Sequence, residues 1–228
     1  MQKPTEWRII PGWIKLLLLV LILLGILFRF SHLDGKVYWH DEAYTTIRAA
    51  GYRGAAIDDA LFSNQRFTAP DLQQYQTLKP DSTLQDTLES LAIEDPQHPP
   101  LYFILSRWWM QQFGSSLTAQ RSLAALLSLL SLPAIYALGT ELFQSRIAGG
   151  MAAALLALSP FDVLYAETNR QYSLQTFLII LSSWLLLRAL RQRKWWLWGI
   201  YGTAAAAGLY TQPLCVLTLM VHGLYVLL

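Results

Sequence analysis

Two adjacent carboxylates, Asp41 and Glu42, lie in the stretch VYWHDEAYTTIRAAG, directly after an apolar run long enough to cross a membrane. Pairs of acids in a surface loop are usually just hydrated. Trp39, His40 and Tyr44 flank this pair, however, and in such an amphipathic setting one carboxylate can act as a general base. The stretch is therefore compatible with a solvated loop, a metal site or a catalytic site.

Two further turns carry groups that suit a phosphate. His98 precedes a double proline, which favours the first turn of a helix. The free N–H groups of such a turn attract anions, and His98 can add a donor. In the turn YAETNRQYSL, Arg170 and Tyr172 follow Glu167. Arg170 would bind a lipid headgroup or, more specifically, a phosphate oxygen, and Glu167 is placed to pair with it.

Metal and nucleophile motifs are missing from the sequence. Without an HExxH pattern, a metal site would have to be assembled from separate parts of the chain, such as His40, Asp41, Glu42 and His98. We therefore expect no cofactor and leave a divalent metal open. A glycine-rich phosphate loop, a serine nucleophile elbow and a CxxC pair are also absent, which argues against nucleotide hydrolysis, esterase and thiol chemistry. Cys215 is the single cysteine, so the chain forms no disulfide with itself.

The composition is that of an integral membrane protein. Of the 228 residues, 54% are hydrophobic and only 14% are charged. The net charge of +2 is too small to indicate a nucleic-acid-binding protein. Residues 31–98 hold 11 of the 15 acids, so the stretch after the first apolar run is the polar part of the chain.

Six apolar segments approach or reach the roughly 20 residues that cross a bilayer as a helix. They are residues 13–30, 121–143, 147–165, 172–190, 195–210 and 213–228. The first follows basic residues but is long for a signal peptide and lacks a small-residue cleavage pattern, so we interpret it as a retained anchor. The predicted fold class is an all-α membrane protein with about six transmembrane helices and interfacial helices in a long outer loop.

The distribution of charge predicts the topology. Residues 99–113 would extend only about 22 Å as a helix, which is short for a span, and their two adjacent tryptophans suit a headgroup layer. If this helix lies in the interface, the basic cluster at 188–194 is cytoplasmic, in agreement with the positive-inside rule. We therefore predict a cytoplasmic N-terminus with a first span (1–30), an outer loop with helices at 55–62 and 82–93 (31–120), and a bundle of about five helices that is cut short (121–228).

The motifs and their order resemble a known family. WHDEAY after the first span, then HPPLYFILSRWWMQQFG, SLTAQRSLAALLSLL and SPFDVLYAETNRQYSL, are similar to the multi-pass glycosyltransferases that include the protein O-mannosyltransferases and the aminoarabinose transferases of lipid A. The resemblance runs from about Arg29 onward. Where many relatives have SQEARxYSL, this chain has AETNRQYSL, so Arg170 and Tyr172 match, Thr168 replaces the glutamate, and Glu167 stands at the preceding glutamine position.

The resemblance implies the N-terminal module of a GT-C enzyme in the plasma (inner) membrane, with its active site facing outward. Such an enzyme transfers a sugar from a polyprenyl-phosphate donor to a lipid, glycan or protein acceptor. Asp41, with Glu42 beside it, maps to the catalytic acid pair, and His98 takes the place of a lysine thought to meet the donor phosphate in the aminoarabinose enzymes. Family members are much longer, which leaves a truncated, non-catalytic protein that keeps a lipid-phosphate-binding site as the alternative.

Overall fold

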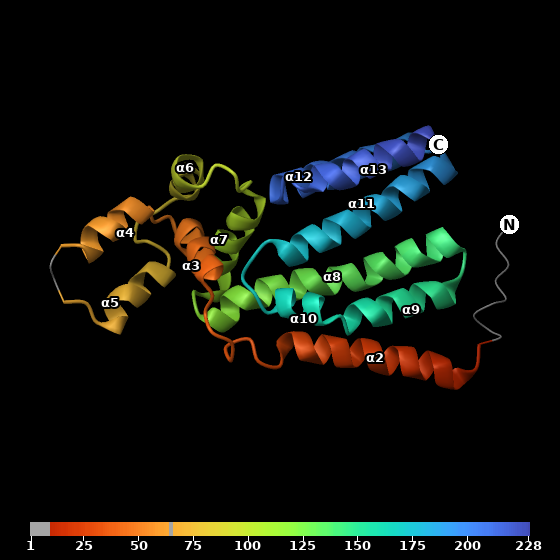
Figure 1. Cartoon of the computed structure of the whole chain (residues 1–228), viewed down its shortest axis with the longest axis horizontal. Coiled ribbons are helices and arrows are strands. Elements are labelled where there is room, and N and C mark those ends of the chain that lie inside the picture. Colours follow the sequence, from red (N-terminus) through yellow and green to blue (C-terminus); the bar gives the residue numbers. More distant parts are fainter. Residues whose placement is uncertain (1–9, 64–65) are drawn as a thin grey trace.

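The computed structural model describes residues 10–63 and 66–228, and the regular structure within these residues is entirely helical. The all-α prediction is therefore confirmed. One group of helices runs side by side along the length of the molecule (Figure 1). It consists of α2 (Gly12–Phe30), α8 (Leu117–Phe143), α9 (Arg146–Ala157), α10 (Pro160–Ala166), α11 (Tyr172–Gln192), α12 (Trp195–Thr211) and α13 (Cys215–Leu227).

Three of these helices, α2, α8 and α11, are long and apolar enough to cross a membrane, and the bent pair α9 and α10 would make a fourth span if it is counted as one. The sequence predicts about six spans. The two remaining candidates are shorter, with 17 residues in α12 and 13 in the apolar α13. At about 1.5 Å per residue, these two helices reach about 26 and 20 Å.

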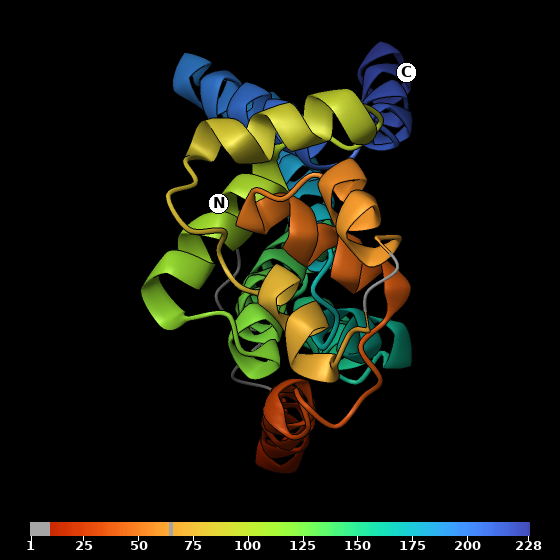
Figure 2. The ribbon, with the colours of Figure 1, turned by 90° about the vertical axis from the view of Figure 1, so that its left-hand side faces the viewer.

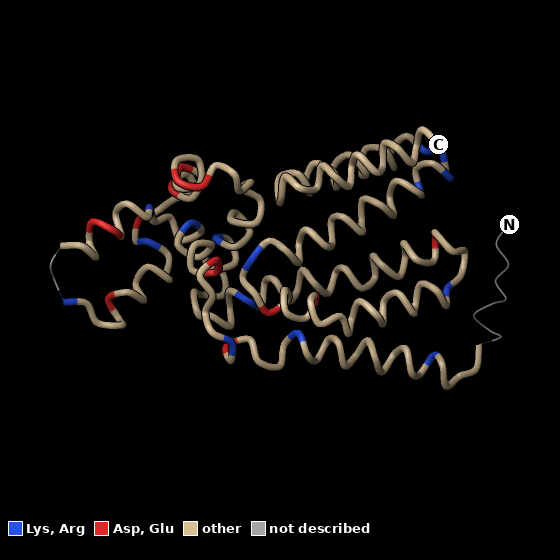
Figure 3. The backbone as a smooth tube through the Cα atoms, in the orientation of Figure 1, with Lys and Arg blue, Asp and Glu red and all other residues tan. Residues whose placement is uncertain are grey.

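A second group of short helices covers one end of the bundle (Figures 1 and 2). It consists of α3 (His40–Ala50), α4 (Gly54–Leu61), α5 (Ala69–Gln73), the 3₁₀ helix η1 (Gln74–Gln76), α6 (Leu84–Glu94) and α7 (Leu101–Phe113). The helices predicted at 55–62 and 82–93 correspond to α4 and α6. Most of the acidic residues gather at this end (Figure 3). We call this group the polar cap.

The predicted span at 147–165 is not one straight helix. α9 ends at Ala157, and α10 begins at Pro160 after a bend of 59°. Pro160 has no N–H to continue the ladder of α9, and Ser159 accepts a hydrogen bond from the backbone N–H of Asp162, which starts a new helix. The Ser-Pro pair is a signal for this break that the apolar pattern alone does not reveal. α10 then leads directly into the turn that carries Arg170.

Arg29, in the last turn of α2, closes this break. Its side chain is fully buried and donates at 2.5 Å to the carbonyl oxygen of Ala157, which is left free where α9 ends, and at 3.1 Å to that of Leu156, which also accepts from the Ser159 N–H. A third bond, at 2.8 Å, goes to the hydroxyl of Ser128 on α8. Gly25 lets α2 approach this closely, because a Cβ there would lie 2.3 Å from the Ala157 oxygen. Arg29 thus joins α2, α8 and the end of α9.

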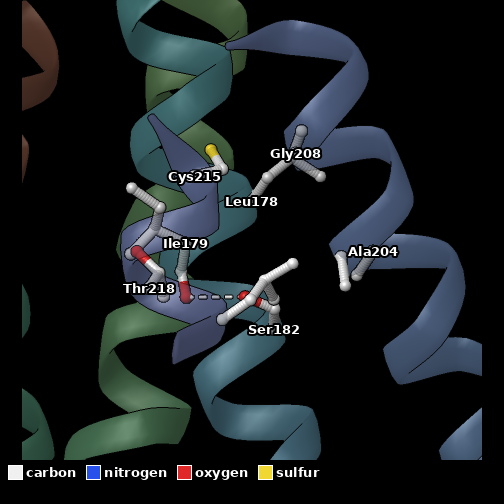
Figure 4. Close-up of a pocket in the computed structure, with 9 residues that line it drawn as sticks. Leu178, Ile179, Ser182, Ala204, Gly208, Cys215 and Thr218 are labelled. Carbon is white, nitrogen blue, oxygen red and sulfur yellow. Dashed lines mark hydrogen bonds between the residues drawn. The ribbon is translucent and has the colours of Figure 1, made fainter. Parts of the chain in front are cut away.

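The apolar core lies where the polar cap meets the bundle. Tyr102 of α7 packs against Leu123 of α8 and against Leu174 and Leu178 of α11, and all four are buried. Further along, α11, α12 and α13 leave a small cavity beside Gly208 and Cys215 (Figure 4). Its volume of about 10 Å³ is no more than a water molecule requires, so this cavity is not a substrate site.

Candidate active site

An open cleft of about 220 Å³ lies between the polar cap and the end of the bundle. Its lining is almost entirely polar, and it comes from three parts of the chain that are distant in sequence. The lining residues are Asp41, Tyr44 and Arg48 of α3, Glu94 at the end of α6, Asp95 and His98 of the connection to α7, and Arg170 of the turn after α10. The structure therefore brings together three of the residues singled out in the sequence: Asp41, His98 and Arg170.

Asp41 lies in the first turn of α3 rather than in a loop. Its side chain is 33% exposed, and its carboxylate faces Arg170, with Oδ2 3.7 Å from Nη2. On the other side, His40 Nδ1 lies 3.5 Å from Oδ1. Both distances exceed those of a good hydrogen bond, so neither neighbour saturates the carboxylate. Asp41 is thus an accessible acceptor held beside a buried cation.

Arg170 and His98 form a polar pair at the same end of the cleft. Arg170 donates through Nη1 to the Thr45 hydroxyl at 3.0 Å, and its Nη2 lies 3.3 Å from His98 Nε2. Because arginine only donates, Nε2 must be the acceptor, and the imidazole proton then lies on Nδ1. Nδ1 is 2.8 Å from the Asp95 carboxylate, which can accept that proton's hydrogen bond. His98 is therefore held between a cation and an anion in a single orientation.

Glu42 is placed quite differently from its neighbour Asp41. It is 1% exposed, and Arg121 of α8 donates to both of its oxygens, from Nε at 2.9 Å and from Nη2 at 2.7 Å. The backbone N–H of Asn169 donates at 2.7 Å and that of Trp39 at 3.1 Å. Four donors leave little of this carboxylate for a substrate. Glu42 instead fixes the start of α3 to α8 and to the turn that holds Arg170.

Glu167 and Tyr172, also predicted for this site, do not line the cleft. Glu167 forms an ion pair with Lys36, so the expected pairing of Glu167 with Arg170 is wrong. The reason is that Lys36, in the link between α2 and α3, runs past the turn, while the Arg170 side chain is directed toward α3. Tyr172 contacts Arg170 from the side: its ring centroid is 5.9 Å from the guanidinium carbon, within the range of a cation–π contact.

A buried chain of polar side chains supports the site, and the sequence analysis did not identify it. Tyr102 donates to Asn169 Oδ1 at 3.0 Å, and Asn169 Nδ2 donates to Gln120 Oε1 at 2.9 Å. Gln120 also accepts from the Thr46 hydroxyl, which in turn accepts from Tyr38 at 2.6 Å. Burial raises the pKa of Tyr102 and raises that of Tyr38 to about 12, so both phenols remain donors at neutral pH.

The missed residues gave only weak signals in the sequence. Arg121 stands at the start of an apolar run, a position typical of headgroup contacts, and Gln120 precedes it. Arg48 and Glu94 lie 46 positions apart yet form an ion pair across the cleft. Nothing in either local pattern indicates the partner.

Other parts of the described chain fit a polar substrate less well. A larger cavity of about 350 Å³ between α8, α11 and α13 is mainly apolar, and its polar lining is limited to groups such as Ser183 and His222. His222 already lies within hydrogen-bond distance of Ser183 and Tyr201. Across residues 10–63 and 66–228, no three His, Cys, Asp or Glu side chains are grouped as metal ligands. Whether the protein needs a metal stays a prediction.

Comparison with protein families identifies the chain. The family described as dolichyl-phosphate-mannose-protein mannosyltransferase matches residues 97–228, which is more than half of the sequence and includes His98, Arg121 and Arg170. The chain belongs to this family. The resemblance seen in its motifs is thereby confirmed. Searches among curated proteins and among solved structures gave no match.

Membership of the mannosyltransferase family makes the chain a membrane glycosyltransferase of the mannosyltransferase type. The family match begins at the cleft, just before His98, and runs through the bundle. Asp41 and the rest of α3 lie outside the matched range. Their link to the matched segment is geometric: Asp41 shares the cleft with two of its residues, His98 and Arg170.

Proposed function

We propose that this protein transfers a sugar from a polyprenyl-phosphate donor to an acceptor hydroxyl on the outer face of the membrane. The observation that carries the proposal is that an accessible carboxylate, Asp41, faces the buried guanidinium of Arg170, which His98 contacts, in one cleft. A glycosyl phosphate needs these two kinds of group: a base for the incoming hydroxyl and cationic donors for the departing phosphate.

The reaction is an inverting displacement at the anomeric carbon. The acceptor oxygen forms a bond to C1 while Asp41 takes its proton. The bond between C1 and the phosphate oxygen breaks, and its electron pair leaves on the polyprenyl phosphate. Arg170 donates to the phosphate oxygens, whose charge increases as the bond breaks, and His98 positions Arg170 by accepting from it at Nε2. Glu42 and Tyr172 position these groups, since they contact the reacting side chains or their supports, and Glu167 fixes the linking segment through Lys36.

The positions of the charges support an outward-facing site in the plasma (inner) membrane with a cytoplasmic N-terminus. The cleft lies at the end of the bundle that carries the polar cap. The last turns of α11 and the link to α12, which carry Arg188, Arg191 and Lys194, lie at the opposite end (Figure 1). The positive-inside rule assigns the opposite end to the cytoplasm. The proposed donor is a polyprenyl-phosphate sugar, and the proposed acceptor is a hydroxyl group of a lipid, glycan or protein.

The test is transfer by the purified protein in lipid nanodiscs, with a polyprenyl-phosphate mannose as donor and hydroxylated peptides and glycolipids as acceptors. Asp41→Asn should lower the rate by about 10²- to 10⁴-fold, the contribution of a general base, while donor binding persists. Asp34→Asn, a change at an exposed acid away from the cleft, is the matched control. Full transfer by Asp41→Asn would exclude Asp41 as the base. Donor binding without transfer by the wild type would favour the non-catalytic alternative.

A further inference from the structure

The cleft continues along α3 beyond Asp41. Tyr44 and Arg48 follow Asp41 by three and seven residues, which places all three on one face of the helix, and all three line the cleft. Seven residues of helix correspond to about 10 Å. The cleft thus extends beyond the proposed phosphate position by a length that one small chemical group can fill. Its volume of about 220 Å³ is below the roughly 300–1,000 Å³ of sites for drug-sized ligands, so its occupant is small.

Arg48 has donor capacity that the fold does not use. Its side chain is only 5% exposed and forms an ion pair with Glu94 through Nη1. Its Nε is buried without a hydrogen-bond partner. Within residues 10–63 and 66–228, the hydrogen bond of the Arg48 side chain is made by Nη1. Buried donors are rarely left unpaired in proteins. Arg170, at the other end of the cleft, likewise has a buried, unpartnered Nε.

Glu94 holds the Arg48 guanidinium in place rather than offering itself to a ligand. It accepts hydrogen bonds from the backbone N–H groups of Gly54 at 2.8 Å and Ala55 at 3.3 Å, at the start of α4, in addition to the Arg48 contact. Glu94 also neutralises the charge of Arg48. The pair is neutral overall, so this end of the cleft offers no net positive charge to a second anion.

Tyr44 supplies the apolar part of the same wall. Its side chain is 41% exposed, and the Arg48 guanidinium carbon lies 5.6 Å from its ring centroid. His40 contacts the ring edge-on, with centroids 4.7 Å apart, so the ring is held from two sides. An aromatic ring beside fixed donors and acceptors suits a ligand that has C–H groups as well as hydroxyls.

We infer that Tyr44 and Arg48 form the subsite for the transferred sugar, which is uncharged, and that Arg48 determines specificity by donating to a sugar hydroxyl. The inference rests on the proposed function, because Arg170 would bind the phosphate and Asp41 would face the reacting carbon at the adjacent end. Arg48 makes no contact with the phosphate. It recognises the sugar, and because Glu94 neutralises Arg48, the subsite offers no net positive charge to a sugar that carries its own carboxylate.

The experiment compares two ligands by titration calorimetry with the full chain in nanodiscs: a short-chain prenyl phosphate, and the same prenyl phosphate carrying mannose. Arg48→Met should weaken binding of the mannose-bearing ligand by about 10- to 100-fold, the effect of losing a hydrogen bond to a charged donor, and change the sugar-free ligand less than about twofold. Arg53→Met removes an exposed arginine with its own partner, Glu89, and should leave both affinities unchanged.

Equal weakening of both ligands by Arg48→Met, or no weakening of either, overturns the subsite. If Arg48→Met does not fold because Glu94 is left unpaired, Tyr44→Ala gives the same selective loss without breaking that pair, and an unselective result again overturns the inference. A wrong donor class looks different, since the wild type would then bind neither ligand, and the subsite would fall with it. Loss of transfer alone leaves both binding measurements, and the test of the subsite, unchanged.

Discussion

Replacing Glu42 by glutamine should destabilise the whole junction between the polar cap and the bundle. Glutamine keeps the size of the side chain but turns one of its two acceptor oxygens into a donor. The new NH₂ group then faces other donors, because Arg121 donates to both oxygens of Glu42 and the backbone N–H groups of Asn169 and Trp39 donate to them as well. The side chains of Glu42 and Arg121 are only 2% and 1% exposed, so water cannot compensate. Breaking a buried ion pair in this way costs about 3–5 kcal/mol.

A loss of that size is a large fraction of the roughly 5–15 kcal/mol by which folded proteins are stable. For a chain of this length it corresponds to a fall of roughly 6–20 °C in the unfolding temperature. Circular dichroism of the detergent-solubilised protein during heating measures the change. The double variant Glu42→Leu, Arg121→Met should be more stable than either single variant, because the double change leaves no buried charge unpaired.

The matched control is Arg53→Met, which breaks an ion pair with both side chains more than 40% exposed. Pairs of this kind contribute about 0–1 kcal/mol, so the control should unfold close to the wild type. If Glu42→Gln unfolds at the wild-type temperature, or if the double variant is the least stable of the set, the buried pair does not hold the junction together.

Three further outcomes are expected. Gly25→Ala should destabilise the protein because its Cβ would lie 2.3 Å from the Ala157 oxygen, whereas Gly199→Ala, in open space, should not; thermal unfolding compares them. Arg29→Met leaves the buried carbonyl oxygen of Ala157 without its donor and should cost about 1–3 kcal/mol, with Arg29→Lys partly restoring stability in the same assay. Burial raises the pKa of Tyr38 to about 12, so the contribution of this phenol to folding stability is complete below about pH 10 and is lost as the pH rises through about 12. Phenolate absorbance during alkaline unfolding measures this loss, and Tyr38→Phe should lack it.

The meeting of Asp41, His98 and Arg170 was predictable from the sequence, because it follows from topology. Each residue stands next to an apolar segment, and the positive-inside rule places those ends on one side of the membrane. Counting the membrane crossings therefore predicts that these distant residues lie on the same side, without any knowledge of how their side chains pack. The short α7 was predictable for a similar reason, since length alone argues against a span.

The partners of the charged groups were not predictable. Glu167 lies three residues from Arg170 but pairs with Lys36, because the paths of two connecting segments, rather than the spacing along the chain, determine which cation is near. Arg29 and Arg121 stand at ends of apolar runs, where an arginine usually reaches the headgroups. Both are instead buried against backbone carbonyls or a carboxylate, and a linear pattern does not show which face of a helix end is covered.

The contact of Arg29 with the end of α9 makes the first helix part of the frame of the cleft rather than a simple tether. α2 is otherwise largely exposed along its length, and it is long and apolar enough to cross a membrane. A helix of this kind tilts to match the thickness of the bilayer. Because Arg29 binds the carbonyls at the α9–α10 break, such a tilt would be transmitted to α10 and so to the turn that carries Arg170. The lipid composition of the host membrane is then a variable that adjusts the cleft, and nanodiscs of graded acyl-chain length offer a direct way to vary it.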